Sequence, residues 1–331
     1  MKKTNLAIVG ATGMVGRTFL KILEQRDFPF NKLYLFASKN SKGKKLICKG
    51  KEYTVEELTE DSFKKDIDIA LFSAGAKVSL KFAPIAKKEG VIVVDNSSAF
   101  RMKEDIPLIV PEVNPEAISS HNGIIANPNC STIQAMVALK PLYDNFGIKR
   151  IVFSTYQSVS GSGVKGVSDL EEGLKGNEKN EAYPYPIANN CIPHIDVFKE
   201  NRYTKEEMKM ILETQKILND DDLKITATAV RVPVFYAHSE SVNIEFKKEF
   251  ELEDIFKIYK DTEGLILKDD IDNLIYPLAT EAEGTDEVYV GRIRRDFSVE
   301  NGLNLWVVAD NIRKGAATNT VQIAEKLINN L

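Results

Sequence analysis

The sequence predicts an α/β protein with two parts: a Rossmann-like, doubly wound parallel sheet, and a second, α+β part built on a mixed sheet. Three observations support this fold class. Short apolar runs alternate with helical patterns over the first 130 residues. A glycine-rich turn, GATGMVG, follows the first of these runs. Beyond residue 130 the apolar runs are longer and have fewer helices between them, which is typical of a mixed or antiparallel sheet.

In the first half, the spacing of apolar residues defines the elements. Short uninterrupted apolar runs indicate buried strands, and apolar residues three and four positions apart indicate helices. Strand, helix and strand in repetition predict parallel strands that are covered on both faces. The expected strands are residues 5–9, 32–37, 68–73 and 91–95, and the expected helices are residues 14–25 and 77–89.

The second half follows a different pattern. A polar segment at residues 177–193, with Pro184, Pro186 and Pro193, is too long for a simple connection, and such loops often carry function. We place the boundaries so that residues 1–128 and a C-terminal helix within 312–331 form one domain, and residues 129–311 form the other. The expected strands are residues 150–158, 224–234, 240–246, 287–292 and 303–309, and the expected helices are residues 204–218 and 313–330.

Composition and charge exclude several classes of protein. The 331 residues suggest two domains at about 150 residues each. The 44 Lys and Arg residues against 48 Asp and Glu leave a formal net charge of -4, so neither nucleic acid nor an anionic membrane is an expected partner. No apolar run approaches the roughly 18 residues of a membrane-spanning helix. The apolar run near the N-terminus is also too short for a signal peptide.

Cysteine and histidine usage indicates the redox environment. The three cysteines show no CxxC spacing, and the three histidines are scattered along the chain. We therefore expect no metal site, no disulfide framework and a location in the reducing cytoplasm.

The glycine turn is a candidate nucleotide-binding motif. Gly10, Gly13 and Gly16 lie between an apolar strand and an amphipathic helix, where glycine lets a pyrophosphate approach the N–H groups of the helix start. The spacing is GxxGxxG instead of the commoner GxGxxG, so a tight turn without a ligand stays open as an alternative. The expected cofactor contacts here are Gly10, Ala11, Thr12, Gly13, Met14 and Val15.

The residues after the second expected strand favour NADP over NAD. An NAD site usually has an acidic residue at this point to bind the ribose hydroxyls. The chain instead has Ser38, Lys39 and Ser41, and hydroxyls with a cation suit a 2′-phosphate. An ordinary lysine-rich surface turn is the alternative. Ser73, Ala74 and Gly75 follow another strand of the same sheet, where a doubly wound fold receives its dinucleotide.

Cys130 is the candidate nucleophile. It lies in NPNCST, immediately before a helical pattern, and the positive end of a helix dipole stabilises a thiolate. Cys48 lies in a strand-like run and Cys191 in the proline-bearing loop, so neither has this placement.

A nucleophile needs a proton acceptor that works near neutral pH, and histidine is the natural candidate. We rank His238 first, because it is expected in a loop between two strands of the second sheet. His194 is expected in the long loop, where it could line a pocket, and His121 in a turn facing solvent.

With these motifs in place, the chain resembles the aspartate-semialdehyde dehydrogenase family from end to end. The resemblance implies NADPH-dependent conversion of L-aspartyl 4-phosphate to L-aspartate 4-semialdehyde and phosphate through a cysteine thioester, in lysine, threonine, methionine and isoleucine biosynthesis. It also implies a homodimer or tetramer formed through the sheet of the catalytic and dimerisation domain. The segments that carry it are GATGMVG (10–16), the S-x-x-S-x-G-K run (38–44), DNSSAFR (95–101), NPNCST (127–132), YQSVSGSG (156–163), EEMKMILETQKIL (206–218), RVPVFYAHSESV (231–242) and ADNIRKGAA (309–317).

The resemblance also implies roles for individual residues. Cys130 is the implied nucleophile, Gln157 orients the substrate carbonyl, and His238 is the acid/base. Arg101 and Lys209 are implied to bind the phosphate, Arg231 the α-carboxylate and Glu206 the α-ammonium group. The remaining implied contacts are Asn129 to the substrate, and Ser160, Gly161 and Asn311 to the cofactor.

The start of the 204–218 helix allows an independent check of Glu206. Thr204 and Glu207 form a T-x-x-E capping box, which gives Glu207 a structural task. Glu206 is then free to bind a ligand, and Lys209 lies three residues further on the same helix face. A surface ion pair between the two is the alternative interpretation.

Two other functions compete with this one. N-acetyl-glutamyl-phosphate reductase has the same architecture and thioester chemistry, but its acylated amine carries no charge for Glu206 to bind. A non-catalytic NADP-binding regulator of the extended short-chain type can also begin GATGxxG, yet it needs neither a helix-capped cysteine nor a histidine after the sheet.

Overall fold

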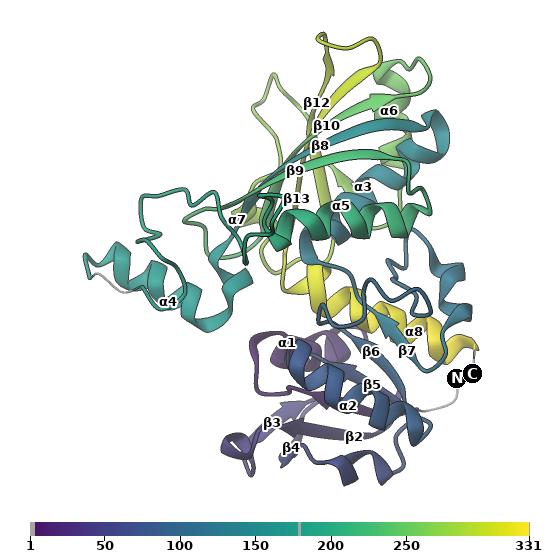
Figure 1. Cartoon of the computed structure of the whole chain (residues 1–331), viewed down its shortest axis with the longest axis vertical. Coiled ribbons are helices and arrows are strands. Elements are labelled where there is room, and N and C mark those ends of the chain that lie inside the picture. Colours follow the sequence, from purple (N-terminus) through teal and green to yellow (C-terminus); the bar gives the residue numbers. More distant parts are fainter. Residues whose placement is uncertain (1–3, 178–179, 331) are drawn as a thin grey trace. The chain divides into compact units, whose positions relative to one another are not determined.

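The computed structural model describes residues 4–177 and 180–330, and the chain folds into two compact units (Figure 1). The first unit comprises Met1–Asn129 and Ala316–Leu331, and the second comprises Cys130–Gly315. Each unit is built on its own β-sheet.

The first unit contains a sheet with the strand order β3-β4-β2-β1-β5-β6-β7. All neighbouring strands pair in parallel except β3, which pairs antiparallel with β4. Connections run outward from β1 in both directions, so right-handed crossovers place α1 and α2 on opposite faces. Figure 1 shows α2 in front of this sheet. The bounds are β1 (Thr4–Val9), α1 (Met14–Gln25), β2 (Phe30–Ala37), β3 (Lys45–Cys48), β4 (Lys51–Glu57), β5 (Ile69–Phe72), α2 (Ala76–Lys88), β6 (Ile92–Asp95), β7 (Ile124–Ala126) and α8 (Asn319–Asn330), with 3-10 helices at Lys39–Ser41, Glu60–Lys64 and Pro115–Ser120.

The core of the first unit explains why these segments fold. Every residue of β1 is buried, as expected for the central strand of a sheet covered on both faces. Helix α1 buries an apolar stripe that includes Phe19 and Leu23. Helix α8, from the end of the chain, contacts α1 and adds Val321 and Leu327 to the same core.

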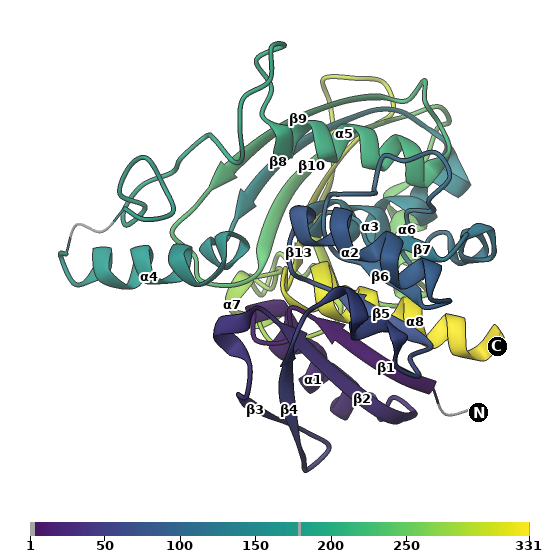
Figure 2. The same cartoon turned by 60° about the horizontal axis from the view of Figure 1, so that its bottom comes forward.

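The second unit contains a mixed sheet with the strand order β11-β12-β13-β10-β8-β9. The β8–β9 and β11–β12 pairs are parallel and the other pairs are antiparallel. Helices α3, α5 and α6 pack on this sheet, and Figure 2 shows α5 beside β9 and β8. The bounds are α3 (Cys130–Phe146), β8 (Ile148–Gln157), a 3-10 helix (Val159–Ser162), α4 (Gly163–Leu174), α5 (Lys205–Leu218), β9 (Lys224–Arg231), β10 (His238–Phe246), α6 (Leu252–Lys260), β11 (Leu265–Leu267), α7 (Ala279–Ala282), β12 (Val288–Asp296), β13 (Gly302–Ala309) and a π-helix (Arg313–Thr318).

Burial along β10 shows which face of this sheet the helices cover. Buried and partly exposed residues alternate strictly from His238 to Phe246. His238, Glu240 and Val242 lie on the buried face, and Ser239 and Ser241 lie on the opposite face. The candidate histidine therefore points toward the helices.

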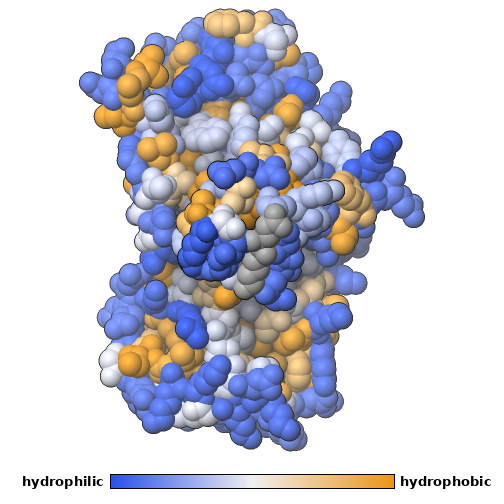
Figure 3. Space-filling model, turned by 90° about the vertical axis from the view of Figure 1, so that its left-hand side faces the viewer, coloured by the Kyte–Doolittle hydropathy of each residue, from blue (hydrophilic) through white to orange (hydrophobic). Residues whose placement is uncertain are grey.

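Helix α4 extends away from the sheet of the second unit in both ribbon views (Figures 1 and 2). Figure 3 shows the side of the molecule that carries this helix, where hydrophobic side chains lie among hydrophilic ones. Val164 and Leu174 of α4 are exposed.

The structure confirms the expected fold class and corrects several details. His238 is the first residue of β10, whereas the sequence placed it in a loop. The last helix begins at Asn319, because the preceding residues form a π-helix. The first sheet is not purely parallel, since β3 and β4 form an antiparallel hairpin at its edge. Part of the expected 177–193 loop lies outside the described residues.

Candidate active site

Cys130 is the first residue of α3, at the positive end of the helix dipole. Its side chain is partly exposed. Gly315 of the π-helix packs directly against it, since a Cβ added to Gly315 would lie 2.8 Å from the Cβ of Cys130. The thiol is therefore accessible, close to a thiolate-stabilising helix end, and confined by backbone.

The other two cysteines lie in different environments. Cys48 is fully buried at the end of β3, and burial, with a smaller effect of Glu24, raises the pKa of its thiol to about 11. Cys191 is exposed. Of the three cysteines, Cys130 alone begins a helix.

His238 is completely buried, and its ring is oriented by one neighbouring residue. The backbone N–H of Ser158 donates to Nδ1 of His238 at 3.1 Å. Burial, with the positive charge of Arg231 as the second cause, lowers the pKa of His238 to about 3. In the described part of the chain, Nε2 has no hydrogen-bond partner. Gln134 of α3 donates to the carbonyl of His238 at 3.3 Å, which connects the helix that begins with Cys130 to the start of β10.

The other two histidines lie outside this cluster. His121 belongs to the first unit and is half-buried, and burial lowers its pKa. His194 stacks on Phe198 with ring centroids 4.4 Å apart.

A chain of polar contacts joins the end of β8 to α5. Gln157, the last residue of β8, donates through Nε2 to Glu206 at 3.1 Å. Lys209 donates to the other oxygen of Glu206 at 2.9 Å and to Asp196 at 3.0 Å. Burial disfavours the charge on Lys209, but Glu206 and Asp196 outweigh it and raise the pKa of the ammonium group. Lys209 is therefore a cation at neutral pH.

The capping box predicted for α5 is confirmed. Glu207 accepts the backbone N–H of Thr204 at 2.6 Å, and Thr204 accepts the N–H of Glu207 at 3.2 Å. Glu207 also accepts the N–H of Ala229 in β9 at 3.1 Å. Glu207 is thus structural, and Glu206 shares a helix face with Lys209, as the sequence predicted.

Arg231 ends β9 and is buried beside the same cluster. Its Nη1 donates to the carbonyl oxygen of Ser158 at 2.7 Å, and the guanidinium lies over the ring of Tyr183 at 5.9 Å. Its Nε has no hydrogen-bond partner in the described residues. A guanidinium held in this way presents a planar fork suited to a carboxylate.

Ser160 and Asn311 form a polar network next to His238. The Oδ1 atom of Asn311 accepts from the hydroxyls of Ser158 and Ser160 at 3.0 and 3.1 Å, and from the N–H of Ala237 at 3.1 Å. The backbone of Gly161 borders the imidazole, since a Cβ there would lie 3.3 Å from Cε1 of His238. The structure therefore brings these three expected cofactor residues to one place.

The first unit holds the glycine turn. Gly10 has a φ of +89°, and a Cβ there would lie 2.7 Å from the carbonyl oxygen of Ser73. A Cβ at Gly16 would lie 2.2 Å from the carbonyl oxygen of Gly10. Only glycine fits at either position. This turn brings residues 10–15 next to residues 73–75 at the carboxyl ends of β1 and β5, where a doubly wound sheet binds ligands.

The 3-10 helix Lys39–Ser41 adjoins this turn. Ser41 lies 3.2 Å from Thr12, hydroxyl to hydroxyl, while Ser38 and Lys39 are exposed. The segment therefore presents a cation and a hydroxyl next to the glycine turn.

Arg101 and Asn129 also belong to the first unit. Arg101 is buried, and its Nη2 donates to the carbonyl of Asn96 at 3.0 Å. Asn129 is buried and directly precedes Cys130.

Two residues near the site were missed from the sequence. Ser158 contacts both His238 and Arg231 through its backbone, which no residue pattern reveals. Glu240 is completely buried two residues after His238, and burial raises the pKa of its carboxyl well above its usual range. A strict alternation from His238 along β10 was the available signal for Glu240.

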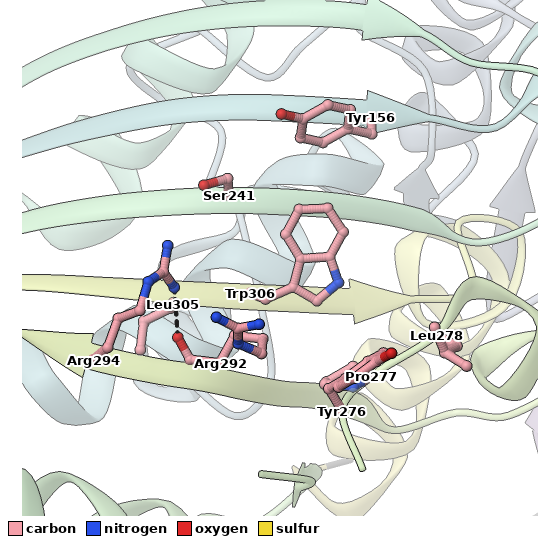
Figure 4. A pocket seen from close by; sticks show the side chains of 9 residues that line it. All are labelled: Tyr156, Ser241, Tyr276, Pro277, Leu278, Arg292, Arg294, Leu305 and Trp306. Atoms are coloured by element: carbon pink, nitrogen blue, oxygen red, sulfur yellow. Dashed lines mark hydrogen bonds between the residues drawn. The ribbon is translucent and has the colours of Figure 1, made fainter. Parts of the chain in front are cut away.

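A separate cavity of about 380 Å³ opens on the other face of the second unit's sheet. Figure 4 shows Tyr156 of β8 and Trp306 of β13 on either side of β10, which carries Ser241, and the two ring centroids are 5.4 Å apart. Arg294 donates to the carbonyl of Arg292 at 2.7 Å at its edge. The lining residues are Tyr156, Ser241, Tyr276, Pro277, Leu278, Arg292, Arg294, Leu305 and Trp306.

The described residues lack two further features. They contain no helix with the length and apolar character needed to cross a membrane. They also contain no group of three or more His, Cys, Asp or Glu side chains that could hold a metal ion.

Comparisons with protein families give two matches. Residues 5–121 match the family model of the semialdehyde dehydrogenase NAD binding domain. Residues 139–314 match that of the semialdehyde dehydrogenase dimerisation domain.

Individual relatives match this chain over nearly its whole length. The aspartate-semialdehyde dehydrogenase of Aquifex aeolicus is 57% identical, over 98% of this chain and 97% of its own length. That of Bacillus subtilis is 49% identical with the same coverage. The crystal structure of aspartate semialdehyde dehydrogenase II of Vibrio cholerae complexed with ASA has a TM-score of 0.95 at 50% identity, over 99% of both chains. The Candida albicans enzyme with NADP has a TM-score of 0.78 at 26% identity, again over 99% of both chains.

Proposed function

The chain belongs to the aspartate-semialdehyde dehydrogenase family, and from this premise we propose that it reduces L-aspartyl 4-phosphate to L-aspartate 4-semialdehyde with NADPH. The observation that carries the proposal is the cluster in the second unit, where Gln157, Glu206 and Lys209 are joined by hydrogen bonds. The reaction belongs to the biosynthesis of lysine, threonine, methionine and isoleucine. A cytoplasmic enzyme with free thiols fits this chemistry.

Cys130 is the proposed nucleophile. Its thiolate attacks the acyl carbon of the substrate, the bond from that carbon to the phosphate oxygen breaks, and inorganic phosphate leaves. The product of this step is a thioester on Cys130. Reduction of the thioester carbon gives a thiohemiacetal, which collapses to the aldehyde and the free thiolate. His238 is the acid/base group at this centre, and Gln157 orients the carbonyl.

The charges of the substrate match the charges of the site. Arg231 binds the α-carboxylate through its planar guanidinium. Glu206 binds the α-ammonium group, and Lys209 with Arg101 binds the phosphate. Asn129, next to the nucleophile, is a further substrate contact. Because Lys209 stays protonated between Glu206 and Asp196, it keeps the positive charge that a phosphate needs.

The glycine turn fits a dinucleotide, because Gly10 and Gly16 leave no room for side chains where the backbone must come close to a pyrophosphate. When bound, NADPH supplies the hydride for the reduction step. We assign the cofactor contacts of the first unit to residues 10–15, Ser38, Lys39, Ser41 and residues 73–75. Those of the second unit are Ser160, Gly161 and Asn311.

We propose that the enzyme prefers NADP to NAD because of the segment that begins at Ser38. Replacing Lys39 by alanine removes a cation that binds the 2′-phosphate. The KM for NADPH should rise about tenfold, since a hydrogen bond to a charged group contributes roughly 1.5 kcal/mol. The KM for NADH should stay unchanged. Parallel kinetics with both cofactors check this, and an equal rise for both would contradict the assignment.

The substrate assignment is tested against N-acetyl-glutamyl-phosphate reductase chemistry with the wild-type enzyme. We expect phosphate-dependent reduction of NADP with aspartate semialdehyde and little with N-acetylglutamate semialdehyde, because an acetylated nitrogen has no charge for Glu206 to bind. A Glu206→Gln variant should lose most of its selectivity between the two. Preference of the wild-type enzyme for the acetylated substrate would overturn the assignment.

The match to the dimerisation domain supports a homo-oligomer. We propose a dimer formed through the face of the second unit's sheet that lies opposite His238. Tyr156 is 39% exposed there and Leu278 is 46% exposed, next to Trp306 (Figure 4). A Trp306→Arg variant places a charge on this face. It should shift the mass measured by light scattering from dimer toward monomer. An unchanged mass would place the interface elsewhere.

A further inference from the structure

We infer that Asn127 is a positioning residue for phosphate binding: its buried amide binds the side chain of Asn96, whose backbone carbonyl in turn binds the guanidinium of Arg101. In this role Asn127 acts through Asn96 and needs no contact with substrate or cofactor. The inference rests on the proposed function, because phosphate binding by Arg101 is part of that proposal.

Three asparagine side chains form a continuous chain of hydrogen bonds in the first unit. Asn319 of α8 donates to Oδ1 of Asn127 at 2.7 Å, and Nδ2 of Asn127 donates to Oδ1 of Asn96 at 2.6 Å. The backbone carbonyl of Asn96 then accepts from Nη2 of Arg101 at 3.0 Å. Asn127 and Asn319 are both 0% exposed, so a broken link would leave a buried polar group unpaired, which is costly. The chain therefore connects the start of α8 to the guanidinium.

One backbone group fixes the direction of this chain. Nδ2 of Asn319 also donates to the carbonyl oxygen of Ile109 at 3.0 Å, and a carbonyl oxygen can only accept. The atom of Asn127 that meets this Nδ2 must then be Oδ1, which leaves Nδ2 of Asn127 to donate to Asn96. Position 127 therefore needs one acceptor and one donor on the same short side chain, and an amide supplies both.

The backbone around Asn127 is held independently of its side chain. The N–H of Asn127 donates to the carbonyl of Asp95 at 2.8 Å, and Ala126 pairs with Asp95 where β7 joins β6. A substitution of the Asn127 side chain keeps both contacts. The course of the chain toward Cys130 should therefore survive the loss of the amide.

Local contacts shape the loop from Asn96 to Arg101. The hydroxyl of Ser97 donates to Asp95 at 2.7 Å and accepts from the N–H of Ala99 at 3.1 Å. These contacts fix the first residues of the loop, and Arg101 closes it by returning to the carbonyl of Asn96. Because the guanidinium binds this carbonyl, the orientation of the Asn96 peptide sets the position of the guanidinium.

The charge of Asp95 is the alternative way to hold Arg101. Asp95 is buried, and its carboxylate accepts from the hydroxyls of Ser79 and Ser97 at 2.6 and 2.7 Å. Burial raises its pKa, and the positive charge of Arg101 is the weakest of the effects that lower it. An attraction of this kind does not orient a planar group, whereas bidentate binding of a phosphate requires a fixed plane. The directed hydrogen bond to the Asn96 carbonyl supplies that orientation.

The test is the KM for phosphate of Asn127→Leu in the oxidation of aspartate semialdehyde by NADP. Leucine has nearly the shape of asparagine and lacks both amide groups. We expect this KM to rise about tenfold, because a displaced Arg101 forms a weaker hydrogen bond to a charged group. The kcat at saturating phosphate should stay close to that of the wild type. A fall in kcat without a rise in this KM would overturn the inference, since Asn127 would then act on the nucleophile.

A double-mutant cycle with Arg101→Met shows whether Asn127 acts through the arginine. Arg101→Met alone should raise the KM for phosphate by about 100-fold, and adding Asn127→Leu should cause no further rise. Additive increases would contradict the inference. If Arg101→Met leaves this KM unchanged, the proposed role of Arg101 fails and the inference fails with it. If Arg101→Met raises it and Asn127→Leu does not, the inference alone fails.

Asn114→Leu is the matched control for lost stability. Asn114 is buried in the same unit, and its amide forms two hydrogen bonds of 2.9 Å, with Val110 and Leu108. The variant should lower the melting temperature about as much as Asn127→Leu does and leave the KM for phosphate unchanged. An equal rise of this KM in both variants would show a general effect of destabilisation and count against the inference.

Asn96→Ala tests the same link at a partly exposed position, where the protein should fold even if Asn127→Leu does not. Alanine removes Oδ1 of Asn96 and keeps the backbone carbonyl. We expect the KM for phosphate to rise as in Asn127→Leu, because the peptide that binds Arg101 loses the same tether. An unchanged KM for phosphate in Asn96→Ala would refute the inference. A wild-type enzyme inactive on aspartate semialdehyde would instead refute the proposed function.

Discussion

The Cys130→Ala variant should lose phosphate-dependent reduction of NADP by aspartate semialdehyde. The side chain that forms the thioester is gone, and alanine has no group that can attack the acyl carbon. Removal of a nucleophile in other enzymes lowers kcat by on the order of 10⁴-fold to 10⁶-fold, and we expect a loss in this range. Steady-state assays at saturating substrate measure it.

Two controls separate lost chemistry from lost structure. NADPH binding by Cys130→Ala, followed by fluorescence titration, should remain near the wild-type value, because the glycine turn belongs to the first unit. Cys191→Ala, at an exposed position, should keep full activity. Substantial activity in Cys130→Ala, or its loss in Cys191→Ala, would show that the wrong thiol has been assigned.

Gly315→Ala should also reduce kcat strongly, although it adds a single methyl group. The new Cβ would lie 2.8 Å from the Cβ of Cys130 and 3.3 Å from its Cα, so one of the two residues must move. Misplacing a reacting group by about 1 Å can cost 100-fold in rate. We therefore expect kcat to fall by about 100-fold, with a small change in KM.

Gly90→Ala is the matched control for this variant. Gly90 has a φ of +82° and no atom near an added Cβ, and it lies in the first unit. Alanine there should cost about 1 kcal/mol of stability through its left-handed backbone and leave kcat unchanged. If Gly315→Ala lowers the melting temperature without lowering kcat, the packing against Cys130 has no role in catalysis.

The sequence predicted elements best where local pattern and tertiary packing agree. The helix expected at residues 14–25 coincides with α1, because a glycine turn marks its start and an apolar stripe runs along its length. The start of α5 was predicted equally well, because Thr204 and Glu207 form a capping-box motif that marks the start of a helix.

The position of His238 was not predicted correctly from the sequence. The expected strand began at Glu240 and left His238 and Ser239 in a loop, yet both residues belong to β10, which lies between β8 and β13. Pairing with two neighbouring strands outweighs the low strand propensity of these residues. Glu240 lay inside the expected strand, and the alternation along it placed Glu240 on the same face as His238 without showing that this face is buried.

Ser158 and Gly315 lie in segments that carry the family resemblance, but the sequence did not reveal their contacts. Ser158 acts through its backbone N–H and carbonyl, which every residue type except proline possesses. Gly315 matters because a π-helix brings it against Cys130, and the pattern at residues 313–330 suggested one continuous helix. Contacts between segments far apart in the chain set both roles.

The most direct test of the account is mass spectrometry of the protein incubated with aspartate semialdehyde and NADP in the absence of phosphate. Oxidation should then stop at the acyl-enzyme, since the acceptor is missing. We predict an aspartyl adduct on the peptide that contains Cys130, which disappears when phosphate is added and never forms on Cys130→Ala. An adduct on a different residue, or turnover without any adduct, would contradict the thioester mechanism.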